Sequence, residues 1–169
     1  MSEDKKVMLR HFLAALAYRT QKALRAAPEG FASFQAGNLT RTPQELVRHM
    51  TSVLGYARTF FRGGSYRPAP LPSFAEEVSR FHAMLHDLAQ HLEADDDLRG
   101  ITAEQLLQGP FADAMTHVGQ LAMLRRLYGD PVAPENFIMA AIDPKNLGEH
   151  QPPPRAPDAE WPERLPAPQ

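Results

Sequence analysis

Asp113-Ala114-Met115-Thr116-His117-Val118-Gly119-Gln120 is the stretch that decides how this sequence is interpreted. In a helix, residues four positions apart project from one face, so Asp113 and His117 place a carboxylate and an imidazole about one turn apart. At 100° per residue the same face carries Leu121, Leu124, Leu127 and Tyr128, with Arg125 and Arg126 outside it. We therefore expect both side chains to face a helical core, where an unpaired polar group costs roughly 2–7 kcal/mol and needs a partner.

Two helices are predicted before this stretch from their apolar stripes and start signals. Residues 5–24 carry an apolar stripe at helical spacing. Thr42 is the expected N-cap of a second helix, with Pro43 in its first turn and Glu45 completing a capping box. This helix should end at Gly63-Gly64. Its apolar stripe comprises Leu46, Met50, Val53, Leu54, Tyr56, Ala57, Phe60 and Phe61, and His49 lies within that stripe.

The remaining helical signals complete a set of four. Ser73 and Glu76 form a second capping box, which opens a helix to about residue 93. A short helical turn is expected from Thr102, and Gly109-Pro110 should break or kink the chain before a fourth helix that ends near Gly129. The sequence predicts an all-α protein, with a four-helix bundle over residues 1–130.

Two proline-bearing segments fall outside the predicted helices. Residues 63–72 contain three prolines and can span up to roughly 33 Å when extended, which permits a crossover along the bundle. Residues 131–169 are predicted to form a Pro-rich C-terminal extension. Either it docks on the bundle through Phe137-Ile138-Met139 and Trp161, or it is partly disordered.

Composition excludes several classes of function. The 169-residue chain has no cysteine, so thiolate ligands, a cysteine nucleophile and disulfides are excluded. The net charge is −2 with a pI near 6.4, and no basic stripe is interleaved with aromatic residues, so no nucleic-acid partner is expected. The charged N-terminus resembles neither a signal peptide nor a membrane span, which predicts a cytoplasmic protein without a membrane partner.

Most of the histidines have simple structural interpretations. His11 lies opposite an apolar face and should be solvated. His82 and His86 have ligand spacing, but they fall on the flank of their helix and are predicted to be surface residues. His91 and His150 belong to no evident cluster.

His49, Asp113 and His117 together predict a metal site. They are two core-facing imidazoles and one carboxylate from two helices, which is how helical bundles build metal centres. Such a set binds divalent ions such as zinc, nickel, iron or manganese and leaves positions open for water or substrate. The alternative is a hydrogen-bonded Asp113–His117 pair without metal, reaching His49 through water.

Two motifs resemble those of the DinB/YfiT-like superfamily. They are Thr42-Pro43-Gln44-Glu45-Leu46-Val47-Arg48-His49 and, some sixty residues later, the stretch from Asp113 to Gln120. The resemblance covers about residues 5–130 and implies an up-down-down-up bundle with a divalent metal. His49 and His117 match two of the three histidines usual in the family, and Asp113 stands in place of the third.

The resemblance also implies a function. Relatives include thiol-dependent S-transferases and a maleylpyruvate isomerase that uses a low-molecular-weight thiol, and members are often homodimers. The expected function is thiol-dependent S-transfer in a homodimer, with Met8 and Tyr18 as apolar positions left for its interface. The alternatives are a non-catalytic dimeric bundle acting in stress response or partner binding, and a metal-dependent hydrolase.

Overall fold

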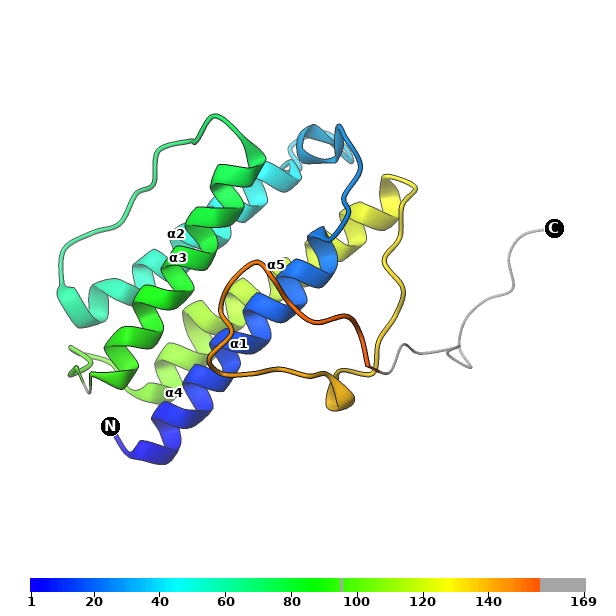
Figure 1. Ribbon diagram of the computed structural model, residues 1–169. Helices are drawn as coiled ribbons and strands as arrows, with labels where there is room; N and C mark the ends of the chain where they lie inside the picture. Colours follow the sequence, from blue (N-terminus) through cyan, green and yellow to red (C-terminus); the bar gives the residue numbers. More distant parts are fainter. Residues whose placement is uncertain (95, 156–169) are drawn as a thin grey trace.

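The computed structural model describes residues 1–94 and 96–155, which fold into an all-α bundle of four long helices (Figure 1). The long helices are α1 (Glu3–Leu24), α2 (Pro43–Arg62), α3 (Phe74–Glu93) and α5 (Ala112–Leu127). Short elements are η1 (Phe31–Ser33), α4 (Ala103–Leu106), η2 (Leu107–Phe111) and η3 (Phe137–Met139). Their directions follow the up-down-down-up order, which confirms the predicted fold class.

The predicted helix starts of α2 and α3 are confirmed by their capping contacts. Thr42 Oγ1 accepts a hydrogen bond from the Glu45 N–H at 3.3 Å, while Glu45 Oε2 accepts one from the Thr42 N–H at 2.9 Å. Ser73 and Glu76 make the same reciprocal pair at 3.2 and 2.9 Å. Each box satisfies two backbone N–H donors, those of the first and fourth residues of the box, that have no partner within the helix, which fixes where the helix begins.

The crossover between α2 and α3 is held against α2 by Tyr66. Its ring lies on the backbone of Gly55, where an added Cβ would fall 1.9 Å from a ring carbon. The Arg58 guanidinium also lies over this ring, 5.0 Å from its centroid. The crossover returns along the length of the bundle, so α2 and α3 run parallel as neighbours (Figure 1).

The C-terminal part of α5 differs from the prediction at two positions. Leu127 was expected in the core but is 58% exposed, whereas Arg125 was expected outside it but is buried. The Arg125 guanidinium donates hydrogen bonds to the carbonyl oxygens of Ala23 and Arg25 at 3.1 and 3.2 Å and pairs with Asp130. Burial is tolerated because the arginine satisfies carbonyls left free at the end of α1.

Residues after α5 return across α1 and pack on it (Figure 1). Lys22 Nζ donates to the Ala133 carbonyl at 2.6 Å, and the Phe137 ring meets Tyr18 edge-on at 6.4 Å. Ile138 and Met139, expected to dock with Phe137, are exposed instead because they lie on the outer side of the η3 turn. Trp161 lies outside the described residues.

Tyr18 is buried, so its assignment to a dimer interface was wrong. Its hydroxyl donates to Glu135 Oε1 at 2.6 Å, and burial together with this carboxylate raises the pKa of Tyr18 to about 12. The returning chain therefore occupies the face of α1 that the helical pattern left uncovered.

Two histidines predicted to be unremarkable are buried in polar networks. His82 lies between α1 and the returning chain: Nδ1 lies 2.6 Å from the Leu147 carbonyl, and Nε2 lies 2.8 Å from Gln21 Nε2. His91 stacks on Phe61 and contacts Asp96 at 2.5 Å. The prediction for His82 was wrong because Leu147, which covers it, follows 65 residues later in the chain, and His91 is covered by Phe61 of α2 and by Asp96 just after α3. His11 and His86 are exposed as expected, and His150 is exposed as well.

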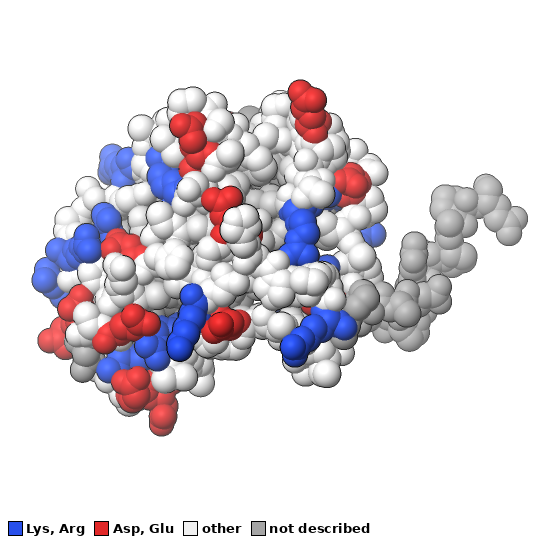
Figure 2. Space-filling view, in the orientation of Figure 1, with Lys and Arg blue, Asp and Glu red and all other residues white. Residues whose placement is uncertain are grey.

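The charges on the face shown in Figure 2 are of mixed sign, with lysines and arginines interspersed among carboxylates. Among the described residues, no helix combines the length and apolar character needed to cross a membrane.

Candidate metal centre

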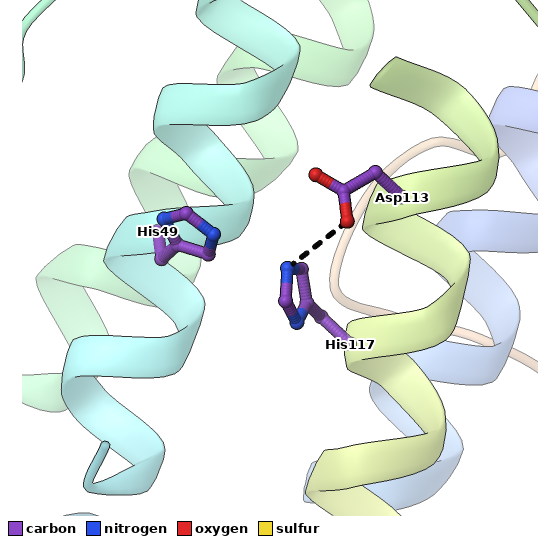
Figure 3. A group of neighbouring side chains, drawn as sticks. All are labelled: His49, Asp113 and His117. Atoms are coloured by element: carbon purple, nitrogen blue, oxygen red, sulfur yellow. Dashed lines mark ion pairs between the residues drawn. The ribbon is translucent and has the colours of Figure 1, made fainter. Parts of the chain in front are cut away.

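His49, Asp113 and His117 are brought together by the facing surfaces of α2 and α5. Each offers one ligand atom, and these atoms all lie within 4.8 Å of one another. Figure 3 shows Asp113 and His117 extending from α5 toward α2, which carries His49. The structure thus gathers all three residues that the sequence predicted as ligands into one candidate metal centre.

The hydrogen bonds of His117 define which of its nitrogens is free. Nδ1 lies 3.0 Å from Gln120 Oε1, an acceptor, so Nδ1 carries the proton and donates it. The lone pair of the neutral ring is then on Nε2. That nitrogen is buried, and no group among the described residues hydrogen-bonds to it. An oriented, buried imidazole nitrogen without a hydrogen-bond partner is typical of a metal ligand whose other nitrogen is held by a second residue.

Asp113 faces that same nitrogen. Its Oδ1 lies 3.4 Å from His117 Nε2, the contact drawn as a dashed line in Figure 3. With the proton on Nδ1, two lone pairs meet at this short distance, which is unfavourable unless a cation or a second proton lies between them. The arrangement therefore fits a cation better than it fits a neutral hydrogen-bonded pair.

His49 completes the group from the opposite helix. Its ring centroid lies 4.7 Å from that of His117, with the planes at 74°. Burial lowers the pKa of His49, and the positive charges of Arg41 and a protonated His117 lower it further, while Asp113 raises it. A lowered pKa favours the neutral imidazole, which is the form that coordinates a metal ion.

Asp113 is not in the core, contrary to the prediction. Its side chain is 52% exposed, because the first turn of α5 lies at the mouth of a cleft and no helix covers it there. We call this cleft the tyrosine cleft. It is lined by Val53, Tyr56, Pro110 and Thr116 together with Asp113. The centre therefore opens to solvent on its carboxylate side.

A further cleft opens on the His49 side. It encloses about 520 Å³ and is lined by residues before α2, by α2 itself and by the crossover. Three arginines, Arg41, Arg48 and Arg67, line it, and we call it the arginine cleft. Sequence reasoning missed this group, because only the fold brings Arg67 of the crossover beside Arg41 and Arg48. It also gave Gln120 no physical role, although the spacing of three residues from His117 could have indicated one.

The donor set suits a divalent ion. Two imidazole nitrogens and one carboxylate oxygen are a three-ligand set used by zinc and by nickel, iron and manganese, with at least one position left open. The clefts on either side give access to such a position. The geometry thus defines an all-α four-helix protein with a candidate His/Asp/His metal centre.

Comparisons of the chain with protein-family models, with curated proteins and with solved structures gave no match. The DinB/YfiT-like assignment stays a prediction that rests on the two sequence motifs.

Proposed function

We propose that His49, Asp113 and His117 bind one divalent metal ion and that the protein is a thiol-dependent S-transferase. The observation that supports the metal site is the buried Nε2 of His117, which has no hydrogen-bond partner among the described residues and faces Asp113 Oδ1 at 3.4 Å with His49 beside it. The transferase activity is supported by the resemblance of the two motifs to the DinB/YfiT-like superfamily.

The chain's own residues have distinct roles in this proposal. His49 and His117 supply neutral nitrogen ligands, and Gln120 holds the His117 ring in the required tautomer. Asp113 adds a negative ligand on the exposed side and so reduces the net positive charge of the centre. A bound divalent ion would lower the pKa of a small thiol and favour its thiolate near neutral pH. Since the chain has no cysteine, the thiol must be supplied as a substrate.

Metal content is the first test. Protein purified without an affinity tag is analysed for metals, as wild type and as His49→Ala and His117→Ala variants. We expect close to one ion per wild-type chain and loss in both variants. His86→Ala is the matched control, because His86 is an exposed histidine outside the centre. Stoichiometric metal in the His49→Ala, His117→Ala double variant would contradict the proposal.

The reaction is tested with metal-loaded protein, a model electrophile such as 1-chloro-2,4-dinitrobenzene, and several small thiols. Turnover should require both the metal and a thiol. Metal-dependent hydrolysis of model esters without any thiol would favour a hydrolase instead. No turnover with any thiol at full metal loading would favour the non-catalytic bundle.

A further inference from the structure

The arginine cleft concentrates positive charge beside the candidate metal centre. Arg41, Arg48 and Arg67 line it, and His49 lies in its wall. The whole chain has a net charge of −2, so this local excess is not a reflection of composition. Positive charge gathered in a concave surface attracts small anions more strongly than the same charges spread over a convex one.

The three guanidiniums have no partner at short range in the described part of the protein, although the charges of Arg41 and Arg48 help to lower the pKa of the nearby Glu45 carboxyl group. Among residues 1–94 and 96–155, none of them makes a hydrogen bond or an ion pair within 4.0 Å. Three arginines on α2 and α3 are paired with carboxylates: Arg58 and Arg62 with Asp87, and Arg80 with Glu77. The contrast indicates that the cleft arginines are available to a ligand.

Glu45 is the one acidic residue in the wall of the cleft. Its carboxylate is engaged in capping α2, with Oε2 accepting from the Thr42 N–H and hydroxyl at 2.9 and 3.1 Å. It therefore offsets only part of the charge of three arginines. Arg48 is half-buried whereas Arg41 and Arg67 are exposed, so a ligand can reach all three.

The three arginines come from separate parts of the fold. Arg41 precedes α2, Arg48 lies on α2 one residue before His49, and Arg67 is on the crossover. Arg67 directly follows Tyr66, whose ring is fixed on Gly55. The contact that holds the crossover to α2 thus also positions one of the cationic groups.

From these observations we infer that the arginine cleft binds a small molecule carrying carboxylate or phosphate groups, held by Arg41, Arg48 and Arg67 with one end at His49. Guanidinium groups suit this class because they donate paired hydrogen bonds to planar carboxylates and to phosphates. The inference deepens the proposed function: it rests on that function in assigning the anion to the thiol substrate. Such a substrate would be an acidic thiol, with its sulfur directed to the centre.

The tyrosine cleft differs in character. Val53, Tyr56 and Pro110 give it a more apolar wall, and it reaches the centre through Asp113. An anionic molecule is disfavoured there because Asp113 carries the same charge. The electrostatics thus separate the two sides of the centre and assign the acidic group to the arginine cleft.

The inference is tested by calorimetric titration of metal-free protein at low ionic strength with two probes, succinate and inorganic phosphate. Using metal-free protein makes the measurement independent of the proposed centre. We expect binding of at least one probe, and the stronger one indicates whether the natural group is a carboxylate or a phosphate. Succinamide, which is uncharged, should not bind. Affinity should fall as salt is added, since exposed charges are screened.

Variants locate the binding. Arg48→Gln and Arg67→Gln should each weaken the affinity for the probe roughly tenfold or more, as expected for loss of one charge-assisted hydrogen bond. Arg155→Gln is the matched control, because it removes the same charge from an exposed residue outside the cleft. Far-ultraviolet circular dichroism checks that each variant folds.

The outcomes separate this inference from the proposed function. Absence of binding by both probes, or equal affinity in wild type, Arg48→Gln and Arg67→Gln, would overturn the inference even if metal-dependent thiol transfer is found. Arginine-dependent binding, combined with a wild-type protein that is found to contain no metal when purified, would support the anion site and contradict the metal centre. For metal-loaded protein, mercaptosuccinate should be a better substrate than uncharged thioglycerol, and Arg67→Gln should remove that preference.

Discussion

Gln120 Oε1 lies 3.0 Å from Nδ1 of His117, and this contact directs the other ring nitrogen toward Asp113. A residue that is not itself a candidate ligand thereby sets the tautomer of one that is. Replacing Gln120 with Leu removes the acceptor and should weaken metal affinity about 10–100-fold, the usual effect of losing such a partner. Gln120→Glu keeps an acceptor and should retain the metal. Competition with a chelator measures the metal affinity of both variants. Equal metal affinity in Gln120→Leu and wild type would contradict the role given to Gln120.

Asp113 should control both the retention of metal and the acidity of a coordinated thiol. Asp113→Ala is expected to lose the ion, whereas Asp113→His is expected to keep it because imidazole is an equivalent ligand. Removing one negative charge should also raise thiol-transfer activity at pH 6.5 relative to that at pH 8. Metal analysis and rates at the two pH values check this. Full metal content in Asp113→Ala would exclude Asp113 as a ligand.

His82 should make stability depend on pH. Burial lowers the pKa of His82 below its ordinary value near 6.5, despite the opposing effects of the Leu147 carbonyl and Glu149. The unfolded chain therefore binds the proton more readily than the folded chain. The contribution is fully present above about pH 6.5 and is lost as the pH falls through the lowered folded pKa.

The measurement compares wild type and His82→Leu by urea unfolding at pH 7.5 and 5.5. At pH 7.5 the variant should be less stable by about 1–3 kcal/mol, since the Leu147 carbonyl and Gln21 lose a buried partner. The difference should shrink at pH 5.5. An unchanged difference at the two pH values would show that His82 does not titrate in this way.

Gly55 should be intolerant of even one methyl group. An added Cβ would lie 1.9 Å from the Tyr66 ring, so the crossover must shift. Gly55→Ala gains about 1 kcal/mol of helix propensity, but overpacking costs about 1–3 kcal/mol, and we expect a net loss of stability. Gly119→Ala is the matched control. Its Cβ meets open space, so the gain in helix propensity should appear without any cost of overpacking. Thermal unfolding of both variants decides, and a more stable Gly55→Ala would refute the packing argument.

Self-association is predicted from the resemblance and from Met8, which is 63% exposed on α1. Methionine and aromatic residues are enriched at such interfaces. Light scattering should give twice the chain mass of 18.9 kDa at micromolar concentration, and Met8→Lys should return the protein to that chain mass. A mass of 18.9 kDa for the wild type across this range would count against a dimer.

The sequence alone determined the features that depend on local spacing. Capping boxes and apolar periodicity located α2 and α3, because both act over three or four neighbouring residues. The same spacing put Asp113 and His117 on one helix face. The presence of His49 in the stripe of α2 was enough to group the three candidate ligands.

Only the tertiary structure decided which groups are buried and what they face. His82 and Tyr18 are covered by a chain that returns more than fifty residues later, and no local pattern encodes that return. Asp113 is exposed because the first turn of α5 lies at the mouth of a cleft. The helical pattern alone had placed Asp113 on the core-facing side of this helix. The arginine cleft likewise joins three separated segments. Burial and electrostatic fields depend on distances in space, whereas helix signals depend on distance along the chain.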